Sequence, residues 1–364
     1  MRRTVVTAIL VLAGGVSMAQ AATDPIRTTV SVSNVVPRRD VDGQILDAHD
    51  GCLEYFQGRF YLYGTKYGTS DGIGRTNRYV CYSSPNLVTW TPHGEMLQGA
   101  PPRVYFRPYV KFNHPTGKYV MWYNADHQYG VAISGRPEGP FIVQNPNVQV
   151  KYSKQRVGDL GLFVDEDGTG YLACTVAGEF GPTFKIKTEP IPHHQICVEK
   201  LTADYLGSTQ ESSELVAGNC ESPSLFKRKG IYYLLFDNTC CFWPDGSGAR
   251  VYTATKPLGP YTYRGNINIK ADHVRDLPSP WTKTGHGRPD TIIKAQQTHI
   301  ATIPTARGIV HLWMGDRWHS CPDGIKGHDF QYWSSPLEFE DDGMVRQLRW
   351  EDQWKLDLDL NPAE

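Results

Sequence analysis

A pattern of paired hydrophobic runs recurs along the chain. Five times, a turn that contains glycine leads into a short run of aromatic and β-branched residues, at 58–63, 117–122, 168–172, 230–235 and 308–313. Another strand-like run comes just before each of these turns, at 53–56, 110–112, 162–164, 224–226 and 300–303. Two such runs joined by a short turn are typical of a β-hairpin. The pattern therefore predicts five hairpins.

The hairpins belong to larger units. A third run often follows the hairpin and ends at a proline, as at 79–85, 131–137 and 251–257. The units recur every roughly 50 to 80 residues, and no long stretch shows a helical period. One small sheet cannot bury both of its faces, whereas sheets stacked around an axis can. We therefore predict an all-β fold, a five-bladed β-propeller. The alternative is a β-sandwich, which rarely repeats a hairpin five times at this spacing.

The N-terminal residues have the composition of a signal peptide. Arg2 and Arg3 precede an apolar run at 4–16, and residues 19–21 (Ala-Gln-Ala) match the small-residue pattern of a cleavage site. The run is too short to cross a bilayer. We expect residues 1–21 to be removed and residues 22–364 to form a single propeller domain. The mature protein should be secreted or periplasmic, without a membrane segment.

Charge and cysteine content narrow the function. The net charge is −1 and no basic stripe is present, so we expect no nucleic-acid partner. All eight cysteines follow the signal segment, and an exported protein can oxidise them. Cys240 and Cys241 are adjacent, and their spacing leaves the pairing open.

An acidic residue stands just before the innermost strand of three units, namely Asp50, Asp159 and Glu221. Innermost strands line the central channel of a propeller and end at one mouth. At equivalent positions of separate blades, the three carboxylates should share a pocket. A single one of them would more often be a turn cap or a loop charge.

Such a set suits glycoside hydrolysis. One carboxylic acid protonates the leaving oxygen, and a carboxylate roughly 6.5–9.5 Å away activates water on the opposite face of the sugar. A third carboxylate near the acid raises its pKa by repulsion between like charges.

The motifs around these residues resemble glycoside hydrolase family 43, whose members are five-bladed inverting glycosidases. Asp50 lies ten residues before Phe60, Asp159 precedes an acidic turn at 165–168, and Glu221 starts a Glu-x-Pro motif followed by an aromatic strand. The resemblance covers about residues 45 to 340. It implies Asp50 as general base, Glu221 as general acid and Asp159 as modulator of the pKa of the acid. Asp47 is a rival for the base.

Further motifs are similar to the exo-β-1,3-galactanase-like members of the family. They lie at 48–49, 106–108, 158–160, 296–298 and 314–318. That branch usually has Glu where this chain has Phe106, and usually lacks an acid at the position of Asp50. The resemblance thus implies a secreted, exo-acting hydrolase for a galactose-, galactofuranose- or arabinofuranose-containing saccharide, working as a monomer. The alternatives are a β-xylosidase and a non-catalytic carbohydrate-binding propeller.

Four polar residues are candidates for binding the sugar. The guanidinium fork of Arg107 suits hydroxyl groups, although an ion pair between blades is an equal alternative. His49 and Gln296 could contact substrate, or be a packed turn histidine and a solvated loop glutamine. Arg317 belongs to the last of the motifs above. Family members often place a histidine near a central metal or water, so the resemblance suggests His299 as a ligand of a structural Ca²⁺. We expect no cofactor to be required.

Aromatic residues could form a platform for the sugar. Phe242 and Trp243 lie in a loop rich in Cys and Pro, where a pocket role is plausible, because apolar sugar faces pack on aromatic rings. Trp122, Trp313 and Trp318 are further candidates, and those inside strands fit the core between blades better.

Overall fold

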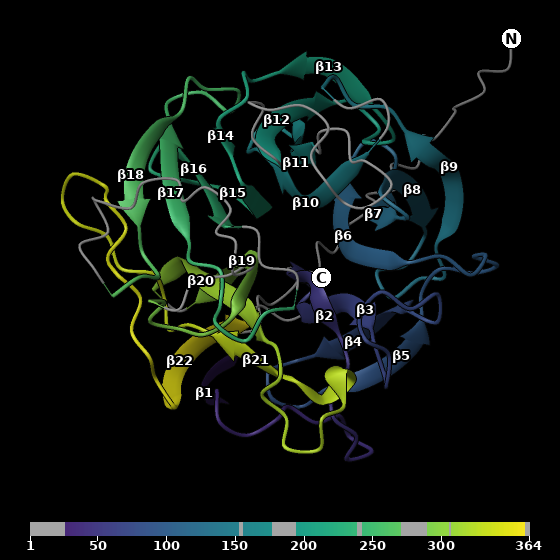
Figure 1. The fold of residues 1–364 in the computed structure, drawn as a ribbon, viewed down its shortest axis with the longest axis vertical. Helices are drawn as coiled ribbons and strands as arrows, with labels where there is room; N and C mark the ends of the chain where they lie inside the picture. Colours follow the sequence, from purple (N-terminus) through teal and green to yellow (C-terminus); the bar gives the residue numbers. More distant parts are fainter. Residues whose placement is uncertain are drawn as a thin grey trace, which may run out of the picture.

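The computed structural model describes residues 26–152, 156–176, 194–238, 242–270, 290–305 and 307–360. Five antiparallel sheets surround a central axis, and this confirms the predicted five-bladed propeller (Figure 1). In the described residues the one helix is a 3-10 turn, η2 (Lys326–His328). No helix there has the length and apolar character to cross a bilayer. The predicted signal peptide and the Cys240–Cys241 pair lie outside the described residues.

The blades follow one another along the chain. Blade 1 consists of β2 (His49–Phe56), β3 (Arg59–Lys66), β4 (Arg78–Ser84) and β5 (Thr91–Glu95). Blade 2 consists of β6 (Tyr105–Asn113), β7 (Lys118–Ala125), β8 (Gln128–Ser134) and β9 (Ile142–Val148). Blade 3 consists of β10 (Val157–Val164), β11 (Gly170–Val176), β12 (Gln195–Leu201), β13 (Ser208–Ser212) and the short β14 (Ala217–Gly218). Blade 4 consists of β15 (Cys220–Arg228), β16 (Ile231–Asn238), β17 (Arg250–Ala254) and β18 (Thr262–Asn266). Blade 5 consists of β19 (Gln296–Thr305), β20 (Gly308–Arg317), β21 (Phe330–Trp333), β22 (Gln353–Leu360) and β1 (Ile26–Ser33).

The second strand of each blade explains the hydrophobic runs of the sequence. β7 and β11 are buried at nearly every position, because each blade is covered by a neighbour on both faces. The outer strands β5 and β9 are mostly exposed and polar. All five predicted hairpins are present, as β2–β3, β6–β7, β10–β11, β15–β16 and β19–β20.

The two ends of the described chain close the ring. β1 pairs antiparallel with β22 over eight residues, and their apolar side chains pack with those of blades 1 and 5. Asn34 fixes this junction. Its amide Nδ2 donates to the carbonyl oxygens of Trp333 and Glu351, both at 3.0 Å, and its Oδ1 accepts from the Trp333 amide at 2.9 Å.

We expect Asn34→Ala to lower the free energy of unfolding by about 2–4 kcal/mol, because it leaves buried backbone groups without partners. Urea denaturation measures this change. Thr29→Val is the matched control, since it removes an exposed hydrogen bond to Asp357 of the same strand pair and should change stability by less than about 0.5 kcal/mol. Equal effects of the two substitutions would contradict the role given to Asn34.

Candidate active site

The innermost strands of the five blades form a ring around the channel. β2 contacts β6, β6 contacts β10, β10 contacts β15, β15 contacts β19, and β19 returns to β2 (Figure 1). Each of these strands begins with a break in its pairing to the next strand of its blade. Such bulges turn side chains out of the sheet plane and are frequent at active sites.

The bulges place the three predicted carboxylates, but not at the same register position. Asp50 is the first residue of its bulge, Asp159 is the second, and Glu221 is the last paired residue before the bulge. The prediction of equivalent positions was therefore wrong in detail. Asp50, Arg107 and Ser222 do correspond, and all three have a positive φ, at 51°, 53° and 54°. Non-glycine residues seldom take this conformation, and when they do they often serve a functional site.

Arg107 is the hub of the cluster. Its Nη2 lies 2.9 Å from Oδ2 of Asp159 and donates to Oγ of Ser222 at 2.6 Å. Ser222 Oγ in turn donates to Asp159 Oδ2 at 2.9 Å. Burial opposes the charge of the guanidinium, but the carboxylates of Asp159 and Asp50 raise the pKa of Arg107 well above its usual range. The arginine is therefore a fixed cation among these carboxylates, and it links blades 2, 3 and 4.

Asp50 has the features of a tuned base. Its Oδ2 accepts a hydrogen bond from the Tyr67 hydroxyl at 2.7 Å, and its backbone amide donates to Oδ2 of Asp316, also at 2.7 Å. Burial raises the pKa of Asp50 to about 6, against the lowering effect of Arg107 and of Tyr67. This value lies near the pH at which a general base is most effective.

Asp47 does not compete for this role. Its carboxylate accepts the backbone amides of Tyr67 and Gly68, at 2.8 and 2.7 Å, and so fixes the turn that carries Tyr67.

Glu221 lies on blade 4, which is not a neighbour of the blade of Asp50 in the ring. Its carboxylate contacts Nδ1 of His194 at 3.0 Å and accepts from Nε2 of Gln296 at 3.3 Å. The Oε1 atom of Gln296 accepts from Trp318 Nε1 at 2.8 Å, which fixes the direction of the amide. Asp237, completely buried, is the cross-strand partner of Glu221. Burial raises the pKa of Asp159 and of Asp237, and the charge of Glu221 adds to both shifts.

Aromatic rings gather next to Asp50. Phe242 lies 5.6 Å from Tyr67, 5.0 Å from Trp318 and 6.4 Å from Phe106, measured between ring centroids. Phe242 is half-buried, as a platform for sugar requires, and Trp243 beside it is 38% exposed. Phe106, which stands where the galactanase-like branch has Glu, therefore brings an apolar ring instead of a carboxylate to this mouth.

Several predicted residues lie elsewhere or do something else. His49 is completely buried, and burial opposes its charge, but Asp316, Asp47 and Asp50 raise the pKa of His49 to about 9. Its Nδ1 pairs with Asp316 at 3.0 Å. Of the two alternatives, a substrate contact and a packed turn histidine, the structure shows the packed histidine.

Arg317 does not reach the centre. Its guanidinium donates to the Asn34 carbonyl and lies over the ring of Trp350. Arg317 therefore lies outside the carboxylate cluster, whereas its neighbour Asp316 contacts that cluster through the backbone amide of Asp50. Trp122 and Trp313 are core residues whose indole N–H groups bond inside the protein.

His299 lies deeper in the channel, beside Glu54 and Lys111. Its Nε2 is 3.8 Å from Glu54 Oε1, which also pairs with Lys111 at 2.6 Å. Burial lowers the pKa of His299 well below its usual value, so the imidazole is neutral. Ca²⁺ prefers six to eight oxygen ligands, whereas among the described residues this place offers one carboxylate, that of Glu54, which is already paired with Lys111. The calcium site stays a prediction, and no step below depends on it.

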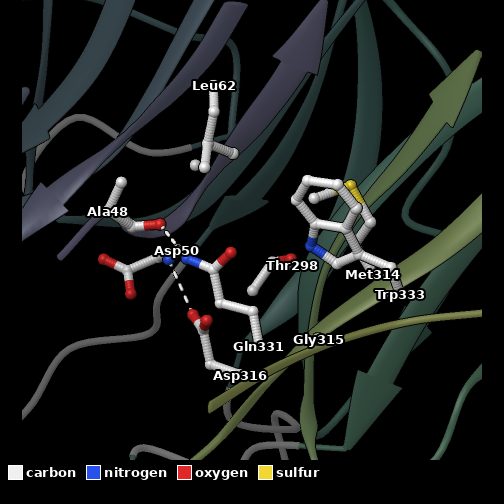
Figure 2. Close-up of a pocket in the computed structure, with 10 residues that line it drawn as sticks. Ala48, Asp50, Leu62, Thr298, Met314, Gly315, Asp316, Gln331 and Trp333 are labelled. Carbon is white, nitrogen blue, oxygen red and sulfur yellow. Dashed lines mark hydrogen bonds between the residues drawn. The ribbon is translucent and has the colours of Figure 1, made fainter. Parts of the chain in front are cut away.

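A small cavity lies behind the backbone of Asp50, between blades 1 and 5. It has room for roughly one water molecule, and Met314, Gln331 and Trp333 are among the residues that line it (Figure 2). The carboxylate of Asp50 points away from these side chains (Figure 2). The cavity is therefore too small for a sugar and lies on the other side of the Asp50 backbone from the carboxylate.

The sequence prediction missed five residues of the cluster, namely Tyr67, His194, Ser222, Asp237 and Asp316. Asp316 lies inside the motif at 314–318 and Ser222 is the middle residue of the Glu-x-Pro motif, so both could have been considered as site residues. The other three carry no local signal in the sequence.

The architecture first defines a class. Two or more carboxylates gathered at one site are what most glycoside hydrolases use, so the cluster of Asp50, Asp159 and Glu221 fits that class of enzyme. The family model for "Glycosyl hydrolases family 43" matches residues 44–297. The chain belongs to this family, as its motifs predicted.

Individual relatives differ in their sugars. The chain is 26% identical over 226 residues to the beta-D-galactofuranosidase xynD of Aspergillus niger, a match that covers 57% of this chain and 61% of the relative. It is also 26% identical over 263 residues to the arabinoxylan arabinofuranohydrolase of Bacillus subtilis, covering 61% of this chain and 51% of the relative. The chain thus corresponds to only part of the length of each.

Solved structures share the fold. An exo-beta-1,3-galactanase from Clostridium thermocellum has a TM-score of 0.71 at 23% identity, and the match covers 91% of this chain and 68% of that one. A beta-1,3-galactosidase of the same family, solved with galactodeoxynojirimycin, has a TM-score of 0.69 at 22% identity, with 89% and 99% covered.

Proposed function

We propose that the protein is an inverting, exo-acting glycosidase, and that it removes galactofuranosyl or arabinofuranosyl residues from a saccharide. The observation that carries the proposal is the cluster of Asp50, Asp159 and Glu221 around Arg107 at the channel mouth. A binding propeller would have no need to bury several carboxylates together. Residues 1–21 support export as the setting for this activity.

The arrangement suggests a division of labour. Asp50 takes a proton from water on one face of the sugar, and Glu221 gives a proton to the leaving oxygen on the other. The two come from blades 1 and 4, which are not neighbours in the ring, and this separation favours direct attack by water over a covalent intermediate. Asp159, held by Arg107 and Ser222, adds negative charge near Glu221 and favours its protonated form.

The residues at the channel mouth and the names of two relatives indicate which kind of sugar the protein cleaves. Phe106 replaces the carboxylate that the galactanase-like branch usually has, so this position cannot accept a hydrogen bond from a pyranose hydroxyl. The two curated relatives are named for galactofuranose and arabinofuranose. Both observations favour furanosides over galactopyranosides.

A panel of aryl glycosides tests the substrate. We expect hydrolysis of the β-D-galactofuranoside or the α-L-arabinofuranoside, and slower or no release from the β-D-galactopyranoside and β-D-xylopyranoside. A preference for either pyranoside would overturn the furanoside assignment. Failure on all four, with a folded protein that still binds saccharide, would favour the binding propeller.

The pH dependence of the reaction follows from Asp50. A base must be ionised, so kcat/KM should fall as the pH drops through about 6, the pKa of Asp50. The Tyr67 hydroxyl stabilises the ionised form, so Tyr67→Phe should raise this pKa and move the acidic limb of the profile to higher pH. Profiles of kcat/KM against pH for both proteins check this. A limb that stays in place or moves to lower pH would be inconsistent with Asp50 as base.

A further inference from the structure

Lys326 extends over the aromatic mouth from the 3-10 turn η2. Its Nζ lies 4.0 Å from the ring centroid of Phe242, 4.5 Å from that of Trp318 and 6.0 Å from that of Tyr67. An ammonium group at such distances is attracted by the negative faces of the rings. The rings thus hold the amine at the same mouth as the catalytic base.

Contacts with blade 1 and with the turn after its strand β3 fix the backbone of η2. The Gly327 amide donates to the Gly68 carbonyl at 2.9 Å, and the Gly327 carbonyl lies 3.3 Å from Nε2 of His49. Gly327 also packs against the carboxylate of Asp47, so closely that a Cβ atom would lie 2.2 Å from Oδ2. A side chain that starts from this turn therefore has a defined place relative to Asp50.

The donors of Lys326 are unused in the described part of the chain. There Nζ makes no hydrogen bond and no ion pair within 4.0 Å. Burial lowers the pKa of Lys326 below its usual value, and the nearby charges of Asp329, Asp50 and Asp316 oppose this shift. An ammonium has three donors and no acceptor. Aromatic faces satisfy its charge in part, but they leave its N–H groups directed at whatever enters the mouth.

We propose that Lys326 is a substrate-binding residue that donates hydrogen bonds to hydroxyl groups of the sugar bound over Asp50. The inference rests on the proposed function for its sugar ligand. The half-buried ring of Phe242 lies beside the amine, so that a sugar at this mouth can contact both Lys326 and the part of that ring that is exposed. The amine also lies close enough to Asp50 for the charge of that carboxylate to act on it.

The test compares Lys326→Met with the wild type. Methionine keeps an unbranched apolar stem on the rings and removes the donors. We expect the affinity for methyl β-D-galactofuranoside or methyl α-L-arabinofuranoside, measured by titration calorimetry, to fall at least tenfold. The KM for the corresponding aryl glycoside should rise in parallel while kcat changes little, and the unfolding midpoint should stay the same.

The matched control is Lys151→Met. Lys151 also holds its amine over an aromatic ring, 4.9 Å from the centroid of Tyr152, but in the connection between β9 and β10, where its backbone amide bonds to Glu199 of blade 3. This variant should bind and hydrolyse like the wild type.

The outcomes separate two claims. Unchanged affinity in Lys326→Met, or a loss that is matched by a lower unfolding midpoint, overturns the assignment of Lys326. If the wild type binds the glycoside but does not hydrolyse it, the proposed glycosidase function is wrong. The affinity of Lys326→Met then still tests the role of Lys326 in binding. A wild type that binds neither methyl glycoside contradicts both.

Discussion

Glu221→Gln should lower kcat about 1,000-fold or more on a natural saccharide, which corresponds to about 4 kcal/mol of transition-state stabilisation. Glutamine keeps the shape of the side chain and its contact with Gln296, but it has no proton to give to the leaving oxygen. Initial rates on an oligosaccharide and on a 2,4-dinitrophenyl glycoside measure the effect. The loss should be far smaller on the dinitrophenyl glycoside, because that leaving group departs without protonation.

A control variant tests whether the loss of activity is specific to Glu221. Asp165→Asn removes a carboxylate that pairs with Lys227 at 2.8 Å on blades 3 and 4, outside the set of residues that touch Glu221. It should keep the turnover of the wild type. An equal loss on both leaving groups in Glu221→Gln would argue that the residue is not the acid.

Asp50→Asn should lower kcat by a similar factor, but on all substrates alike. The base acts on water, so the decrease in kcat when it is removed should not depend on the leaving group. Asparagine keeps a side-chain oxygen that can accept the hydrogen bond from Tyr67, so we expect the fold to survive. Rates on the same two substrates, with and without azide, measure this.

Azide also tests the role of the residue. In an inverting enzyme, azide takes the place of water and gives a glycosyl azide of inverted configuration. A rescued product of retained configuration would require azide to attack a covalent intermediate, and would contradict Asp50 as the base of an inverting enzyme. Asp47→Asn is the control, because Asp47 fixes the Tyr67 turn from outside the reaction, and its loss should affect stability more than turnover.

Much of the fold could be predicted because its signals are local. Each hairpin is encoded in a few consecutive residues, as at 53–56 and 58–63, and burial of both blade faces makes these runs apolar. The order of the blades then follows the order of the chain. The junction of β1 with β22 could not be predicted, since it joins residues 26–33 to residues 353–360 and neither segment has a hairpin partner nearby.

The site was predictable only where a motif carries it. Asp50, Asp159 and Glu221 begin recognisable strands, whereas the contact between Asp50 and Asp316 joins residues 266 positions apart. Arg317 shows the limit clearly. Successive residues of a strand face opposite sides, and the bulge near Gln297 shifts the register of β20, so the motif alone did not tell whether Asp316 or Arg317 faces the centre.

The stereochemistry of the first product tests the central claim most directly. Proton NMR during hydrolysis of the preferred aryl furanoside, recorded before the released sugar equilibrates, shows the configuration at the anomeric carbon. The account predicts that the sugar first appears with the configuration opposite to that of the substrate, because Asp50 directs water from the face opposite the leaving group. Initial release of the sugar with the configuration of the substrate would contradict it.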